Sequence, residues 1–129
     1  PLSLAELEYL HIRKTGALIR AAVLLGAHCG EPLAETELAR LDHYAKIAGL
    51  LFQVVDDILD SAADTATLGK TAGKDAASNK PTYVSLLGLA KAREKATELL
   101  MAAHAALAPF GEPARRLGEL TNFIVNRSF

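Results

Sequence analysis

The sequence predicts an all-α protein from its composition, its apolar spacing and the turns between its apolar segments. Half of the 129 residues are hydrophobic but only 5% are aromatic, and alanine and leucine are plentiful, which favours helices over sheets. Apolar side chains recur at helical spacing in several segments that short turns separate. We therefore expect residues 1–129 to form a single helical unit with short antiparallel connections.

The helices can be placed by their capping residues and breakers. Ser3 and Glu6 have the spacing of a capping box, so a first helix should begin there and end near Gly30. The remaining segments are a turn around 31–32, a helix to about Ser61, a loop over about 62–80, a helix from Pro81 to about Leu107 with a possible break at Gly88, a turn over 108–113, and a last helix over about 113–127. The loop contains two glycines, three threonines and three lysines without an apolar period, and loops of that length are functional or mobile.

One helix carries acidic side chains on a single stripe. Gln53, Asp56, Asp57 and Asp60 are spaced at i, i+3, i+4 and i+7. An ordinary amphipathic helix with a wet face would give the same periodicity. However, like charges at this spacing repel, aspartate is a poor helix former, and residues 47–69 contain no lysine or arginine. Because Mg²⁺ takes one or two carboxylates together with substrate phosphate oxygens, the stripe favours a magnesium–phosphate site.

Basic residues that could hold a phosphate lie nearby in the sequence. His11, Lys14 and Thr15 share one face of the first expected helix by the same spacing rule. Lys70 and Lys80 belong to the loop that follows the acidic stripe. Each lysine alone is typical of a solvated surface, and His11 alone is typical of a packed or surface histidine. Together with the acids they fit the clamping of a diphosphate leaving group.

Composition excludes several other classes of protein. Fourteen basic against fifteen acidic residues give a net charge of -1, which does not suit a nucleic-acid surface. Apolar runs are too short for a membrane span, and no signal peptide opens the chain. The single cysteine, Cys29, cannot form an internal disulfide, so we expect a cytoplasmic protein and a buried thiol. Because the chain begins at Pro1 without a methionine, we expect it to be a piece of a longer protein.

Four stretches together resemble a known family: HIRKTGALIRAA, YAKIAGLLFQVVDDILD, DTATLGKTAGKD and NKPTYVSLLG. They are similar to the C-terminal half of trans-isoprenyl diphosphate synthases, most of all the bacterial farnesyl diphosphate synthases. The resemblance implies the all-α isoprenoid synthase helical fold around a central cavity. It also implies a short-chain prenyltransferase that ionises an allylic diphosphate, joins the cation to isopentenyl diphosphate and releases a proton.

The resemblance implies a role for most of the candidate residues. The ligands of Mg²⁺ would be Asp56, Asp57 and Asp60, the last near the metal or through water. The diphosphate oxygens would be held by Lys14, Lys70 and Lys80. The developing carbocation would be faced by Thr15 and Gln53. His11 corresponds to a family position to which the resemblance assigns no role.

The chain also departs from the family. Members are more than twice as long, and their first aspartate-rich motif and most of their isopentenyl-binding residues lie in the N-terminal half. We therefore expect this chain to be inactive by itself, to associate with that missing half, and to belong to a homodimer in the intact protein. Two alternatives stay open. One is a non-catalytic helical subunit that regulates a prenyl synthase, although such subunits tend to lose their aspartates. The other is a terpene cyclase or head-to-head condensing enzyme, which uses a different second metal motif.

Overall fold

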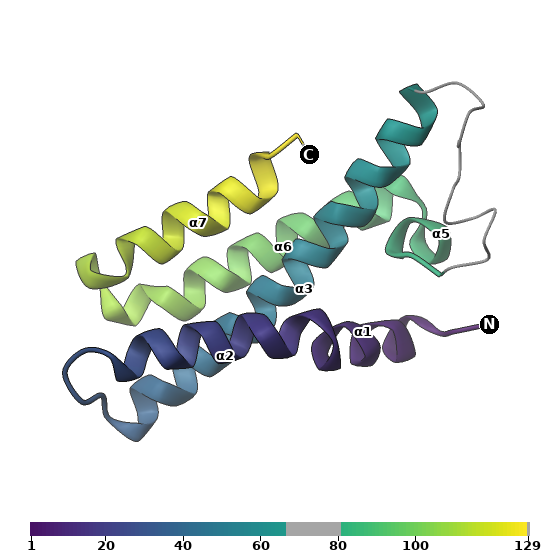
Figure 1. Ribbon diagram of the computed structural model, residues 1–129. Coiled ribbons are helices and arrows are strands. Elements are labelled where there is room, and N and C mark those ends of the chain that lie inside the picture. The colour runs from purple at the N-terminus through teal and green to yellow at the C-terminus, as the bar shows by residue number, and fades with distance from the viewer. Residues whose placement is uncertain (67–80, 129) are drawn as a thin grey trace.

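The computed structural model describes residues 1–66 and 81–128, and the side chains of 1–63 and 81–128. Within these ranges the chain is helical and contains no strand, which confirms the predicted all-α class. Its elements are α1 (Leu4–Arg13), α2 (Thr15–His28), α3 (Glu35–Ala66), α5 (Tyr83–Leu87), α6 (Leu89–Leu107), the 3-10 turns η1 (Ala108–Phe110) and η2 (Glu112–Ala114), and α7 (Arg115–Asn126). The long helix α3 is central and contacts every other described α-helix (Figure 1).

The first expected helix is capped as predicted but is broken. The Ser3 amide donates to the Glu6 carboxylate at 2.8 Å, and the Glu6 amide donates to Ser3 Oγ at 3.3 Å. At Lys14 the backbone leaves the helical region, with φ -90° and ψ -84°, so α1 and α2 are separate helices. Directly after the break α2 crosses α3 at a pair of glycines, since a Cβ added to Gly49 would lie 3.1 Å from the Cα of Gly16. The prediction of one continuous helix was therefore wrong at this point.

The helix α3 extends further than the sequence indicated. It runs from Glu35 to Ala66, so residues 62–66 are helical rather than part of the expected loop. Its two halves bury apolar side chains in two clusters, one around Leu51 and Val54 with α1, α5 and α6, and one around Tyr44 with α6 and α7. Burial between residues 41 and 57 of α3 stabilises a helix of this size. The rest of the expected loop, 67–80, lies outside the described residues.

The predicted break at Gly88 is confirmed. This residue has φ +84°, a conformation that favours glycine, and it separates α5 from α6. The helix α5 begins at Tyr83 rather than at Pro81, because Thr82 caps it. Thr82 Oγ1 accepts from the Ser85 amide at 2.9 Å, and Ser85 Oγ accepts from the Thr82 amide at 2.8 Å. This reciprocal pair fills the role of a capping box.

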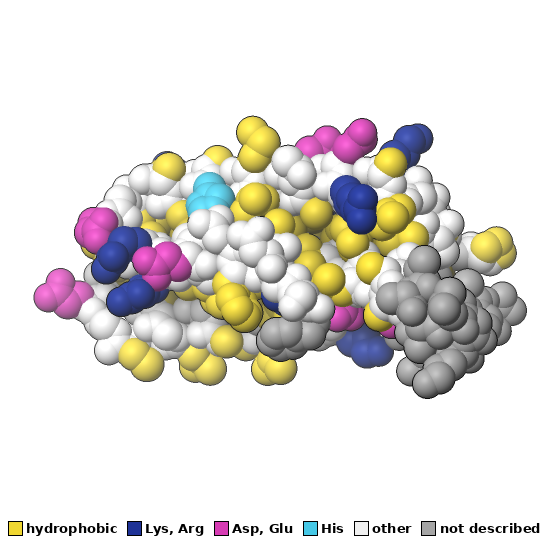
Figure 2. All heavy atoms as spheres, turned by 90° about the horizontal axis from the view of Figure 1, so that it is seen from above, with side chains coloured by type: hydrophobic (Ala, Val, Ile, Leu, Met, Phe, Trp, Pro, Cys, Tyr) yellow, Lys and Arg dark blue, Asp and Glu magenta, His cyan; other side chains and the backbone are white. Residues whose placement is uncertain are grey.

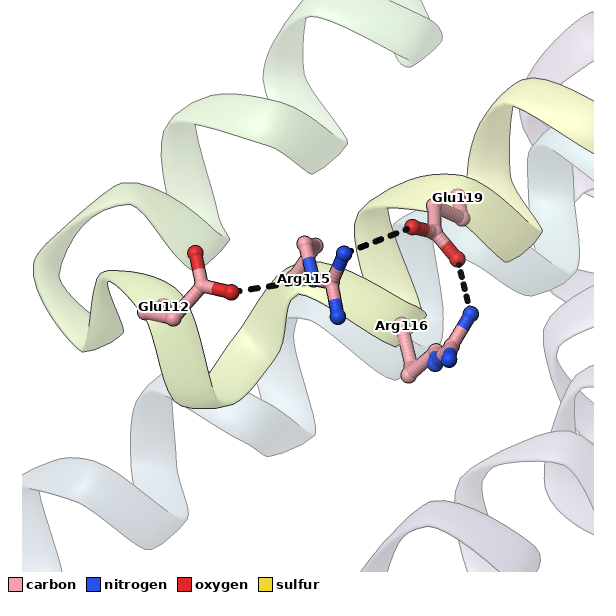
Figure 3. Close-up of polar contacts among 4 residues, drawn as sticks. All are labelled: Glu112, Arg115, Arg116 and Glu119. Atoms are coloured by element: carbon pink, nitrogen blue, oxygen red, sulfur yellow. Dashed lines mark hydrogen bonds and ion pairs between the residues drawn. The ribbon is translucent and has the colours of Figure 1, made fainter.

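The last helix, α7, begins with a cluster of exposed charges. Its first turn holds Arg115 and Arg116 and no acid, an unfavourable arrangement at the positive end of a helix dipole. Glu112 pairs with Arg115 at 3.0 Å, and Glu119 pairs with Arg116 at 2.9 Å (Figure 3). These pairs offset the repulsion, although exposed ion pairs contribute little stability.

Part of the apolar surface stays exposed. Figure 2 shows hydrophobic side chains gathered along the middle of one face and at its edge. Cys29, expected to be buried, is exposed because it lies just beyond the end of α2. Among the described residues, no helix combines the length and the apolar character that a membrane crossing requires.

Candidate functional site

A cavity of about 740 Å³ lies between α2, α3 and α7. Its walls are mainly aliphatic and aromatic, for example Leu18 on α2, Ala48 on α3 and Phe123 on α7. Polar groups come from Lys14 and Thr15, where α2 begins, and from Arg127, where α7 ends. The cavity is therefore an apolar groove with cationic and hydroxyl groups at one end, which suits a ligand with an apolar body and an anionic head.

Arg127 closes this end of the cavity against α3. Its guanidinium lies 4.2 Å from the centre of the Phe52 ring, donates from Nη2 to the Phe52 carbonyl at 3.1 Å, and donates from Nε to the Ile124 carbonyl at 3.2 Å. The side chain is only 9% exposed, and Nη2 lies 4.0 Å from Asp56 Oδ1. The acidic stripe thus has a cationic neighbour after all, supplied by the far end of the chain rather than by residues 47–69.

Asp56 and Asp57 point in different directions. The Asp56 side chain is 54% exposed and lies on the Arg127 side of α3. Asp57 is only 7% exposed. Its Oδ1 accepts from Gln53 Nε2 at 3.1 Å, and its Oδ2 accepts from the backbone amide of Tyr83 at 2.9 Å. Adjacent residues of an α-helix project about 100° apart. Asp56 therefore lies near Arg127, whereas Asp57 reaches the start of α5.

The different surroundings of Asp56 and Asp57 decide how the acidic stripe fits a metal ion. Across residues 1–63 and 81–128, no three histidine, cysteine or acidic side chains are grouped so that they could hold a metal. Asp57 is engaged by two protein donors, whereas Asp56 faces outward as an oxygen ligand that a hard cation prefers. Asp60 is half-buried one turn further along α3. The structure therefore brings Gln53 and Asp57 together, whereas among the described residues the three aspartates do not form a group that could hold a metal.

The basic candidates are placed unevenly. Lys14 and Thr15 line the cavity as neighbours at the break between α1 and α2. His11 does not share their face, because the helix breaks at Lys14; its Nδ1 lies 3.3 Å from the Tyr83 hydroxyl. Lys70 and Lys80 lie outside the described residues. Gln53 is not among the residues that line the cavity.

Two residues near the site were missed by sequence reasoning. Tyr83 is fully buried, with its ring centre 5.3 Å from that of His11. Burial, helped by the charges of Glu8 and Asp57, raises the pKa of the Tyr83 hydroxyl far above its ordinary value, so the group stays neutral. Arg127 was missed because it contacts a residue 75 positions earlier. Neither position carries a local signal.

Comparison with known proteins gives a matching family model and relatives whose names are farnesyl or geranylgeranyl diphosphate synthases. Residues 2–108 match the family model described as polyprenyl synthetase. A probable farnesyl diphosphate synthase of Sinorhizobium fredii is 54% identical over 114 residues, which are 86% of this chain and 34% of that protein. Farnesyl diphosphate synthase of Escherichia coli is 47% identical over 97% of this chain and 43% of its own length. Geranylgeranyl pyrophosphate synthase 4 of Arabidopsis thaliana is 42% identical over 98% of this chain and 34% of its own length.

Solved structures give the same result. A putative farnesyl-diphosphate synthase from Marinomonas superposes with a TM-score of 0.78 at 40% identity, over 97% of this chain and 41% of that one. A geranyltransferase from Helicobacter pylori superposes with a TM-score of 0.72 at 31% identity, over 98% of this chain and 39% of that one. The chain thus spans between 34% and 43% of the length of these five proteins.

Proposed function

The chain belongs to the polyprenyl synthetase family, as its motifs predicted, and on that basis we propose that it forms part of a prenyltransferase. The reaction is the condensation of an allylic diphosphate with isopentenyl diphosphate to a short-chain isoprenyl diphosphate of the farnesyl or geranylgeranyl class. The observation that carries this proposal is the cavity between α2, α3 and α7, which is apolar along its length and has Lys14, Thr15 and Arg127 at one end. An isoprenoid diphosphate has the same division into an apolar chain and an anionic head.

In the proposed reaction the allylic carbon–oxygen bond breaks, and its electron pair leaves with the diphosphate. Lys14, and Lys70 and Lys80 from the part of the chain that is not described, would hold the diphosphate oxygens through charge-assisted hydrogen bonds. The hydroxyl oxygen of Thr15, which lines the cavity, would face the cation that remains. The family resemblance gives the amide oxygen of Gln53 the same role, although Gln53 itself does not line the cavity. The double bond of isopentenyl diphosphate then attacks this cation, and loss of a proton restores the alkene.

A divalent metal fits one part of the acidic stripe. Asp56 and Asp60 would hold Mg²⁺, because Asp56 presents an exposed carboxylate beside the polar end of the cavity. When bound, Mg²⁺ would neutralise charge on the leaving diphosphate. The family resemblance names Asp56 and Asp57 as ligands, with Asp60 near the metal or through water, but the hydrogen bonds that Asp57 accepts from Gln53 and from the Tyr83 amide make its direct use costly.

The partners that we propose follow from the open side of the cavity and from the length of the relatives. Leu18 is 76% exposed and Phe123 is 58% exposed although both line the cavity, and apolar surface of this kind is typical of an interface. We propose that residues corresponding to the rest of the family fold cover it, that the intact protein is a cytoplasmic homodimer, and that the chain alone is inactive.

The experiment uses the full gene product with dimethylallyl and isopentenyl diphosphates, and the products are separated by chromatography. In parallel, a thermal shift is measured with Mg²⁺ and pyrophosphate together and with each alone. We expect a prenyl product and a shift for the pair that exceeds the sum of the single shifts, because the metal bridges carboxylate and phosphate. Asp56→Ala should abolish the excess. No product and a flat shift in the unaltered protein would reject the enzyme and favour the non-catalytic helical subunit.

A further inference from the structure

We propose that Asp57 is a positioning residue, which fastens the first turn of α5 to α3 and orients the amide of Gln53, and is not a direct metal ligand. The inference deepens the proposed function, on which it rests for the role of Gln53. The two adjacent aspartates of one motif would then have different tasks. Asp56 would bind the metal, and Asp57 would position α5 and Gln53.

The contacts of Asp57 are those of a buried helix cap. Tyr83 opens α5, so its amide N–H has no partner within its own helix. Asp57 Oδ2 accepts from this amide at 2.9 Å, across 26 positions of sequence. Thr82 satisfies a second amide of the same turn, that of Ser85. The Thr82 contact is local to α5, whereas the Asp57 contact joins α5 to α3, beside which it lies (Figure 1).

The second contact of Asp57 determines which way Gln53 faces. An ionised carboxylate only accepts hydrogen bonds, so Gln53 must present its Nε2 to Asp57 Oδ1, as it does at 3.1 Å. The amide oxygen of Gln53 is thereby directed away from Asp57. A side chain proposed to stabilise a cation needs its oxygen, not its NH₂ group, turned toward the charge.

Burial explains why Asp57 resists a change of partner. A carboxylate that is 7% exposed is stable only while it is hydrogen-bonded. A metal on Oδ1 or Oδ2 would compete with Gln53 or the Tyr83 amide for an oxygen that already accepts a hydrogen bond, and any weakening of the Tyr83 contact would leave a buried amide poorly satisfied. Asp56, at 54% exposure, can accept a metal without such a loss.

The test compares Asp57→Ala, Asp57→Asn and Asp56→Asn in the full gene product. The asparagine oxygen can still accept from the Tyr83 amide, and its NH₂ group can donate to a flipped Gln53, whereas alanine can do neither. Hydrogen–deuterium exchange of α5 is followed by mass spectrometry in metal-free buffer. Binding of Mg²⁺ with pyrophosphate is measured by calorimetry on the same proteins.

We expect Asp57→Ala to accelerate exchange of α5 at least about tenfold, because a buried amide loses its acceptor. Asp57→Asn should stay within about threefold of the unaltered protein in both measurements, since it keeps the acceptor. Asp56→Asn should leave α5 unchanged and weaken Mg²⁺–pyrophosphate binding at least about tenfold, because even the loss of an outer-shell partner weakens metal affinity by about that factor.

Two results would overturn the inference. One is exchange of α5 in Asp57→Ala at the rate of the unaltered protein. The other is loss of Mg²⁺–pyrophosphate binding in Asp57→Asn equal to that in Asp56→Asn. If the unaltered protein does not bind Mg²⁺ with pyrophosphate at all, the proposed function fails, and the metal-free exchange measurement alone still decides the role of Asp57.

Discussion

Replacement of Arg127 tests whether the end of α7 clamps the middle of α3. Arg127→Ala removes the stacking on Phe52 at 4.2 Å and the hydrogen bonds to the carbonyls of Phe52 and Ile124. A desolvated cation–π contact contributes about 1–2 kcal/mol. The two hydrogen bonds add about 1 kcal/mol together; the Phe52 carbonyl lies inside α3, whereas the Ile124 carbonyl lies in the last turn of α7, where carbonyls have no partner within the helix. We therefore expect a loss of about 2–3 kcal/mol in the free energy of unfolding.

The assay is urea denaturation of the full gene product, in which the midpoint should fall while the m-value is unchanged. Arg127→Lys is the matched control. It keeps the charge but not the planar fork that reaches two carbonyls and stacks on a ring, so it should lose about half as much. A double-mutant cycle with Asp56→Ala should give a coupling below about 1 kcal/mol, because Asp56 is half-exposed and 4.0 Å away.

The clamp would be refuted if the free energy of unfolding of Arg127→Ala stayed within about 0.5 kcal/mol of that of the unaltered protein, which is the range of an ordinary surface substitution. A coupling to Asp56 as large as the whole effect would show instead that Arg127 acts through its charge alone. In that case Arg127→Lys should be neutral.

Three further predictions concern the packing around α3. Gly49→Ala should destabilise the protein by about 1–3 kcal/mol, since its Cβ would lie 3.1 Å from the backbone of α2. Gly26→Ala has open space around it and should be neutral or stabilising, and urea denaturation of both variants compares them. Tyr44→Phe should cost about 1 kcal/mol in urea denaturation, because its hydroxyl donates to a carbonyl of α7 at 3.2 Å. Asp42 accepts from an arginine of α2, which lowers the pKa of its carboxyl. The stability from this pair is complete above the ordinary pKa of 3.8 and is lost as the pH falls below it. Asp42→Asn should flatten the acid limb of a plot of stability against pH; an unchanged limb would contradict the pairing.

Much of the fold could be predicted because helices are local. The capping box at Ser3 and the break at Gly88 depend on residues within one turn of each other, and both are confirmed. The family resemblance was equally local, since it rested on short motifs such as FQVVDDILD, and it is confirmed. The errors came where a distant element overrides a local pattern. At Lys14 the close crossing of α2 over α3 accompanies a break that apolar spacing alone does not reveal.

The candidate site shows the same division. The sequence by itself determined that one helix carries Asp56 and Asp57, and that Lys14 and Thr15 belong to a second motif of the same family. Both depend only on residue type and spacing. Only the tertiary structure decided that Asp56 lies beside Arg127 while Asp57 caps α5, and that Lys14 reaches the end of an apolar cavity. The physical reason is that hydrogen-bond partners and burial depend on which elements pack together, and those elements lie tens of residues apart in the chain.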